Sequence, residues 1–145
     1  MTKTLFDTSV LVSAFVVSHP KHQSCIPWLH QVKAKQVQGI IATHTLAETY
    51  SVLTRLPVSP RISPRLARQL INENLQEFEV VSLEAEDYYK VIDKMVTLNL
   101  TGGAIYDALI AQVAIKAKVS QLLTLNPDHF TRLGDEIARL VLSPN

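Results

Sequence analysis

The sequence predicts an α/β fold in which helices cover both faces of a central parallel sheet. Short apolar runs alternate with longer segments of helical periodicity, and this alternation requires crossover connections between parallel strands. The chain has 145 residues, which corresponds to one domain large enough to bury a core without disulfides. No repeat, low-complexity segment or linker divides it. We therefore expect residues 1–145 to form a single domain.

The first half of the chain predicts two strands and three helices. The strands are the apolar runs 4–6 and 40–42, and the helices are expected over 10–17, over 19–36 and around 46–53. We expect Gly39 to break the second helix before the second strand begins. The helical side chains expected to face the core are Cys25, Leu29, Val32, Leu46, Tyr50 and Leu53.

A loop over residues 57–64 follows, because its three prolines are excluded from a helix interior. Ser63 is expected to cap the next helix, with Pro64 in its first turn. The later elements are a strand over 78–82, helices over 84–98 and 104–118, and strands over 122–124 and 140–142. The expected apolar helix faces contain Leu66, Leu70, Ile71, Leu75, Tyr88, Val91, Ile92, Met95 and Leu98.

Composition excludes several classes of protein. A net charge of +1 argues against a strongly basic nucleic-acid coat protein, and the single Cys25 excludes an internal disulfide and a zinc site built on several thiolates. No run approaches the roughly 20 apolar residues of a membrane span. We do not expect residues 5–17 to act as a signal peptide, because Asp7 interrupts the apolar stretch and no small-residue cleavage site follows. We expect a cytoplasmic protein with no membrane partner.

Polar side chains follow the predicted strands at the end where parallel α/β sheets bind their ligands. Asp7 follows the first strand, and Glu48 lies in the helix after the second. Asp107 lies in the first turns of the helix that begins near residue 104, and Asn126 and Asp128 follow the strand at 122–124. We expect the fold to carry these side chains to one end of the sheet.

Each acid has a simpler explanation when it is taken alone. Asp7 suits a helix cap, Glu48 a solvated helix face, and Asp128 a turn after Asn126. Asp107 could be an exposed acid stabilised by the helix dipole, but it lies in an otherwise apolar segment, where burial of its charge costs several kcal/mol unless a partner compensates.

Taken together, the acids predict a cation site. Two carboxylates ~4 Å apart repel by about 4 kcal/mol at an effective dielectric constant of 20, so a cluster of them protonates or binds a cation. Oxygen ligands without a set of Cys or His favour Mg²⁺ or Mn²⁺. Such an ion can activate a water to attack a phosphodiester and can neutralise the charge that develops.

Four segments resemble, in their order and spacing, the motifs of the PIN-domain family, and in particular the VapC-type toxins of bacterial toxin–antitoxin pairs. The segments are residues 6–12, 46–50, 106–111 and 123–130. The resemblance implies a three-layer α/β/α PIN-like fold with a central parallel sheet. It also implies a Mg²⁺- or Mn²⁺-dependent endoribonuclease that hydrolyses RNA with a metal-activated water, forms a homodimer and is inhibited by a small cognate antitoxin.

The resemblance also implies roles for individual residues. Asp7, Glu48 and Asp107 match the three main acids, with Asp7 and Asp107 as metal ligands. The hydroxyl positions near the metal match Thr8, Ser9 and Thr124. The fourth acidic position of the family holds Asn126 here, so Asn126 or the nearby Asp128 is expected to position a second ion or the attacking water.

The asparagine at this position keeps an alternative open, a catalytically inactive PIN-like module that binds RNA or protein. A phosphoryl-accepting domain that uses Asp7 is disfavoured. Such hydrolases resemble one another in an Asp-x-Asp-x-Thr pattern, and Asp7-Thr8-Ser9 lacks its second aspartate.

The middle of the chain separates its charges. Residues 49–72 contain four bases and no acid, and residues 73–87 contain six acids and no base. The bases are Arg55, Arg61, Arg65 and Arg68. They are expected to contact RNA phosphates or an acidic stretch of an antitoxin, because acids alone repel RNA; the alternative is a solvated helix face.

Histidines and apolar residues extend these expectations. His19 and His22 are expected near the substrate entrance, and His44 and His129 follow predicted strands near the proposed site. An apolar surface for a dimer or an antitoxin helix, or else part of the core, is expected from Val52, Leu53, Leu56, Ile62, Leu66 and Leu70.

Overall fold

A five-stranded sheet, with every strand parallel to its neighbours, forms the centre of the computed structural model, which describes all residues from 1 to 145. The strands lie in the order β3-β2-β1-β4-β5. Their bounds are β1 Thr2–Phe6, β2 Val37–Ala42, β3 Glu79–Val81, β4 Gln121–Leu123 and β5 Val141–Leu142. The predicted α/β class and parallel sheet are therefore confirmed.

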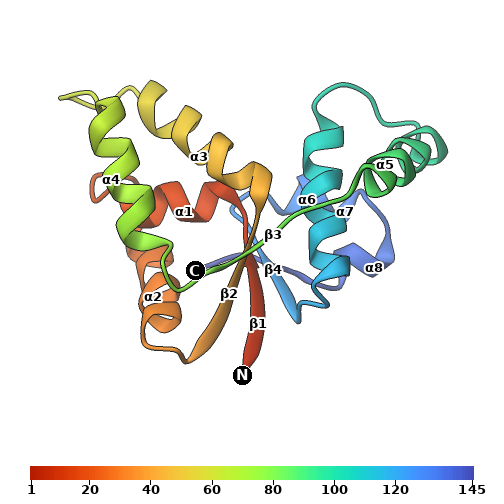
Figure 1. Cartoon of the computed structure of the whole chain (residues 1–145), viewed down its shortest axis with the longest axis horizontal. Coiled ribbons are helices and arrows are strands. Elements are labelled where there is room, and N and C mark those ends of the chain that lie inside the picture. The colour runs from red at the N-terminus through yellow and green to blue at the C-terminus, as the bar shows by residue number, and fades with distance from the viewer.

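Helices cover both faces of the sheet and give three α/β/α layers (Figure 1). One layer contains α1 Thr8–Phe15, α2 His22–Lys33, α3 Thr43–Arg55 and α4 Pro64–Asn74. The other contains α5 Ala85–Leu98, α6 Ala104–Lys116, α7 Pro127–Thr131 and α8 Asp135–Ala138. None of these helices is both long and apolar enough to cross a membrane.

Alternating side chains of the strands build a separate core under each helix layer. Phe6 and Ile41 face the cluster formed with α1 to α4, whereas the adjacent Leu5 and Ile40 face the cluster formed with α5 to α8. All four side chains are fully buried. Burial on both faces explains why the strands appear in the sequence as continuous apolar runs.

Gly39 was expected to break a helix, and that prediction is wrong. The helix ends at Lys33, Lys35 takes a left-handed conformation with φ 59°, and Gly39 lies inside β2. A Cβ atom at Gly39 would come within 2.7 Å of Phe78 and 2.9 Å of Val32. Glycine is thus present because the aromatic ring of Phe78 packs directly on the strand.

Four of the side chains expected to face the core are exposed instead: Tyr50, Leu66, Tyr88 and Ile92. On α5 the core contacts come from Val91 and Met95, and on α3 from Thr45, Thr49 and Leu53. Apolar periodicity predicted each of these helices. It did not predict how each helix is rotated about its own axis, and this rotation decides which part of a wide apolar face packs on the core.

One local prediction is confirmed, and two short helices were missed. Ser63 caps α4 as expected, since its Oγ accepts a hydrogen bond from the Leu66 N–H at 3.1 Å and Pro64 is the first helical residue. The short helices α7 and α8 were not predicted, because segments of five and four residues are too short to show a helical period.

The apolar positions expected to serve a partner divide between core and surface. Leu53 and Ile62 are buried in the core, and Leu66 is exposed. Partial burial against the same core is found for Val52, Leu56 and Leu70. Only Leu66 of this set therefore remains largely open to a partner.

Candidate active site

Asp7 is buried at the point where β1 ends and α1 begins. It occupies the N-cap position of α1, but its side chain makes no capping hydrogen bond. Its Oδ2 instead accepts hydrogen bonds from the hydroxyls of Ser9, at 2.9 Å, and Thr124, at 2.8 Å. The simple capping explanation of Asp7 is therefore wrong, and two hydroxyls from different segments fix the orientation of its carboxylate.

Burial raises the pKa of Asp7 above its ordinary value, and the negative charge of Glu48 adds to the rise. The hydrogen bonds from Thr124 and Ser9 act in the opposite direction, because they favour the ionised carboxylate. The net effect is a raised pKa, so the protein compensates the charged form of Asp7 only in part. A cation close to Asp7 would supply that compensation.

Asp107 lies in the first turn of α6 and is partly buried, with 25% of its side chain exposed. Burial raises its pKa; His129 and Arg132 lower it, whereas the charges of Asp7 and Glu48 raise it further. Its Oδ2 lies 3.8 Å from His129 Nδ1 and 3.5 Å from Arg132 Nη2. The pKa of Asp107 thus responds to both other acids, although the three come from separate parts of the chain.

Glu48 lies one turn into α3, with 36% of its side chain exposed. Its Oε2 is 3.9 Å from Nε2 of His44, one helical turn earlier. The imidazole of His44 stacks on the ring of Tyr106 from α6, with ring centroids 5.5 Å apart and planes inclined by 8°. The stack links the α3 and α6 segments that carry Glu48 and Asp107.

Asp7, Glu48 and Asp107 line one cavity of about 580 Å³ at the carboxyl ends of β1 and β4. The predicted residues that line it are Asp7, Thr8, Ser9, Glu48, Arg55, Asp107 and Asn126. Thr124 is fully buried and reaches the site through its hydrogen bond to Asp7. The structure therefore brings the three acids to one cavity, as the strand-end rule predicts.

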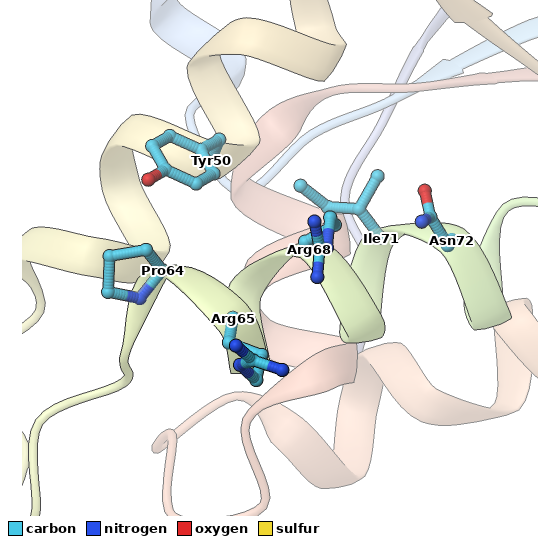
Figure 2. Close-up of a pocket in the computed structure, with 6 residues that line it drawn as sticks. All are labelled: Tyr50, Pro64, Arg65, Arg68, Ile71 and Asn72. Carbon is cyan, nitrogen blue, oxygen red and sulfur yellow. The ribbon is translucent and has the colours of Figure 1, made fainter.

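Asp128 and three of the four arginines do not line this cavity. Asp128 is exposed in the first turn of α7, and Arg61 is exposed in the loop before α4. Arg65 and Arg68 line a separate hollow of about 480 Å³ between α3 and α4, together with Tyr50, as Figure 2 shows. Only Arg55 among the predicted bases lines the cavity that contains the acids.

The residues of the cavity fit a hard divalent cation. No three His, Cys, Asp or Glu side chains approach closely enough to form a ready-made metal cage. Mg²⁺ does not need one, because it is bound through one or two carboxylates and keeps several waters. Thr8, next to Asp7 in the chain, also lines the cavity, and its buried hydroxyl has no hydrogen-bond partner within the protein.

Several residues of the site were missed from the sequence or only loosely placed. Ser13 lines the cavity one turn after Ser9, and helical spacing was the signal that could have found it. Tyr106 was recognisable only as the neighbour of Asp107. Arg132 carried no signal, because the short helix α7 that leads to it was not predicted.

The loop after α1 adds His19 to the cavity wall. Its Nδ1 accepts a hydrogen bond from the Lys21 N–H at 3.0 Å, and its Nε2 lies 3.5 Å from Ser13 Oγ. Burial lowers the pKa of His19, and the neighbouring His22 lowers it further. Of His19 and His22, only His19 lines the cavity; His22, the first residue of α2, contacts the backbone oxygen of Ser13.

Comparison with known proteins gives consistent matches over most of the chain. Residues 4–136 match the PIN domain. The chain is 37% identical over 119 residues to Ribonuclease VapC40 of Mycobacterium tuberculosis, covering 81% of this chain and 82% of that protein. It is 35% identical over 108 residues to Ribonuclease VapC27 of the same organism, covering 74% of each.

A solved structure supports the fold independently. The chain superimposes on the crystal structure of VapBC2 from Rickettsia felis, bound to a DNA fragment from their promoter, with a TM-score of 0.71. The match covers 99% of this chain and 100% of that chain at 20% identity. At this identity the similarity establishes the fold and carries no statement about the chemistry.

Proposed function

The chain belongs to the PIN-domain family, and from that premise we propose that it is a Mg²⁺- or Mn²⁺-dependent endoribonuclease and the toxin of a toxin–antitoxin pair. The observation that carries the proposal is the shared cavity of Asp7, Glu48 and Asp107, three acids from three elements. Ribonuclease is also the activity that the names of the two relatives at 35–37% identity state for those proteins.

Asp7 and Asp107 are the groups proposed to hold the cation, with Glu48 as the third acid of the site. Bound there, a divalent ion would supply a water of lowered pKa and neutralise charge that develops on the phosphodiester. Ser9 and Thr124 hold the Asp7 carboxylate in a fixed orientation through their hydrogen bonds. Preorganisation of this kind reduces the rearrangement required when the ligand binds.

Asn126 takes the place of a fourth acid in this proposal. Asn126 is among the residues that line the cavity, whereas Asp128 is not. A carboxamide oxygen binds a water or an ion without adding negative charge, so Asn126 is better placed than Asp128 to position the attacking water. A second metal ion is correspondingly less favoured at this corner of the site.

RNA, an antitoxin and a second copy of the chain are the proposed partners. Arg55 lines the same cavity as the acids and suits a phosphate of the RNA. The hollow that contains Arg65 and Arg68 suits either further phosphates or an acidic stretch of the antitoxin. A homodimer, and a cytoplasmic location where RNA substrates occur, complete the proposal.

Cleavage of single-stranded RNA tests the proposal. We expect cleavage with Mg²⁺ or Mn²⁺ and none with EDTA, and we expect Asp107→Asn to reduce the rate by at least about 100-fold while keeping the fold. The matched control is Asp93→Asn, which changes an exposed acid on α5.

Two results would contradict the proposal. Full activity of Asp107→Asn would remove Asp107 from the site. Absence of metal-dependent cleavage by the wild-type protein, together with retained RNA or protein binding, would instead establish the inactive PIN-like module that Asn126 keeps open.

A further inference from the structure

An aromatic pair that the proposed chemistry does not use joins the wall of the acidic cavity to α3, and its member Tyr106 lines the cavity. Tyr106 of α6 and His44 of α3 lie nearly parallel, with ring centroids 5.5 Å apart and planes inclined by 8°. Offset stacking at this separation is a favourable arrangement for two aromatic rings. The pair therefore holds the Tyr106 ring in a defined orientation although it joins two separate helices.

Tyr106 is accessible as well as oriented. Its exposed fraction is 52%, and it lines the same cavity as Asp7, Glu48 and Asp107. In the sequence it directly precedes Asp107, and His44 precedes Glu48 by one helical turn. A flat, partly open aromatic surface thus lines the same cavity as the three acids.

We propose that Tyr106, supported from behind by His44, forms a stacking platform for a base of single-stranded RNA next to the phosphate that is cleaved. The inference rests on the proposed nuclease function and specifies its substrate as unpaired RNA. Every base has a π-face, so stacking on an aromatic side chain binds single strands with little sequence preference. A paired base is already stacked within its helix and cannot occupy the platform without being unpaired.

The position of the platform matches the geometry of a nucleotide. A base is joined through one sugar to its phosphate, so a ring beside the acids is within reach of a nucleotide whose phosphate lies among them. The cavity also presents Arg55 for a neighbouring phosphate. The acids thus provide a metal site, Arg55 a contact to the RNA backbone, and Tyr106 a contact to a base. Recognition and cleavage of a bound single strand use all three.

Substitutions at Tyr106 separate stacking from other roles of the side chain. Tyr106→Phe keeps the ring and removes the hydroxyl, whereas Tyr106→Leu removes the ring and keeps an apolar side chain. Tyr89→Leu is the matched control, because Tyr89 is an exposed tyrosine on α5 that does not line the cavity. His44 is not varied, since it also contacts Glu48.

The experiment measures kcat and KM on short single-stranded RNAs, and the affinity of a fluorescent RNA for the same variants in an Asp107→Asn background with Mg²⁺. We expect Tyr106→Leu to weaken RNA binding and raise KM about 10-fold, with Tyr106→Phe and Tyr89→Leu close to the wild-type protein. An RNA with one abasic nucleotide at the stacked position should show the same weakening with the wild-type protein. It should show no further weakening with Tyr106→Leu.

Several outcomes would overturn the inference. It fails if Tyr106→Leu binds and cleaves RNA as Tyr106→Phe does, if no abasic position reproduces the weakening, or if the two effects multiply. It also fails if the fluorescent RNA is not bound at all, or if Tyr106→Leu alters only the oligomeric state measured by light scattering. The binding measurement keeps the two proposals distinguishable. RNA binding that depends on Tyr106, together with no cleavage by the wild-type protein, would refute the nuclease and retain the platform.

Discussion

At the scale of single residues, burial of Asp7 is the feature that connects stability to function. Asp7 is 8% exposed, and two neutral hydroxyls hold its carboxylate, with no cationic side chain paired to it. An ionised carboxylate in such a place is destabilising until a cation neutralises it. The ionised carboxylate of Asp7 thus lowers the stability of the metal-free protein, and the binding of a metal ion would raise that stability again.

Asp7→Asn should therefore stabilise the metal-free protein at neutral pH. The folded protein holds the proton of Asp7 more tightly than the unfolded chain does, because burial raises the pKa. As the pH rises from below about 3.9 through the raised value, the unfolded chain loses this proton first, and the free energy of unfolding falls. Asparagine removes that decrease and keeps an oxygen for the two hydroxyls.

Thermal unfolding in EDTA between pH 3 and pH 7 measures this effect. The melting temperature of Asp7→Asn should exceed that of the wild-type protein by a few degrees at pH 7, and the difference should shrink toward pH 3. Addition of Mg²⁺ should stabilise the wild-type protein only. A variant that is less stable by the same amount at every pH would show that the ionised carboxylate of Asp7 is not costly.

The sequence located the three acids because each follows a strand or begins the helix after one, and parallel strands place such positions together. It did not locate Arg132, His19 or Ser13 with the same clarity. Their approach to the acids depends on short turns and on the rotation of helices, and neither leaves a periodic pattern in the sequence. The sequence also did not distinguish Asp128 from Asn126. The two lie two residues apart, and only Asn126 lines the cavity.

At the scale of secondary-structure elements, the contact between β2 and Phe78 determines how one layer packs on the sheet. Phe78 lies over Gly39 and meets Phe6 edge to face, with ring centroids 5.0 Å apart and planes inclined by 85°. The sequence showed Gly39 only as a possible break between elements. Its actual role depends on a residue far later in the chain, which local pattern cannot reveal.

Gly39→Ala should destabilise the protein by about 1–3 kcal/mol, the usual cost of overpacking a core. The added Cβ would lie 2.7 Å from two ring carbons of Phe78, and the ring is confined by Phe6. Gly103→Ala is the control for stability, because a Cβ there meets nothing within 4 Å. Chemical denaturation measures both, and equal stability of the two variants would show that the sheet adjusts without cost.

Helix rotation is the other property that the sequence left open at this scale. Tyr88 and Ile92 extend the apolar face of α5 beyond the part that covers the core, so both were expected to be buried and both are exposed. Apolar periodicity reports the width of a face. The residues that are covered depend on where the neighbouring α6 lies, and this is a tertiary property.

At the scale of the whole molecule, acidic and basic surfaces are separated. The acids and Arg55 share the cavity at the strand ends, whereas Arg65 and Arg68 share the second hollow with Tyr50. Tyr50 is two residues from Glu48 and therefore on a different face of α3. A ligand that contacts both regions must therefore pass around α3. Phosphates of an RNA bound at the second hollow are thus separate from the phosphate that reacts at the acids.

Joint replacement of Arg61, Arg65 and Arg68 by alanine should weaken RNA or antitoxin binding and leave kcat unchanged. If the three arginines bind RNA, the slope of log KM against log salt should fall by about 0.7 for each phosphate that they neutralise in the wild-type complex. Arg139→Ala is the control, since Arg139 is exposed at the end of α8. Unchanged RNA cleavage and unchanged antitoxin affinity would remove these arginines from both surfaces.

The most direct test of the metal site is a crystal of the wild-type protein soaked in MnCl₂ and measured for anomalous scattering from manganese. We predict a single dominant peak in the cavity, about 2 Å from carboxylate oxygens of Asp7 and Asp107, that disappears in Asp107→Asn. A peak elsewhere, or no peak at Mn²⁺ concentrations that support RNA cleavage, would contradict the assignment of these acids to the cation.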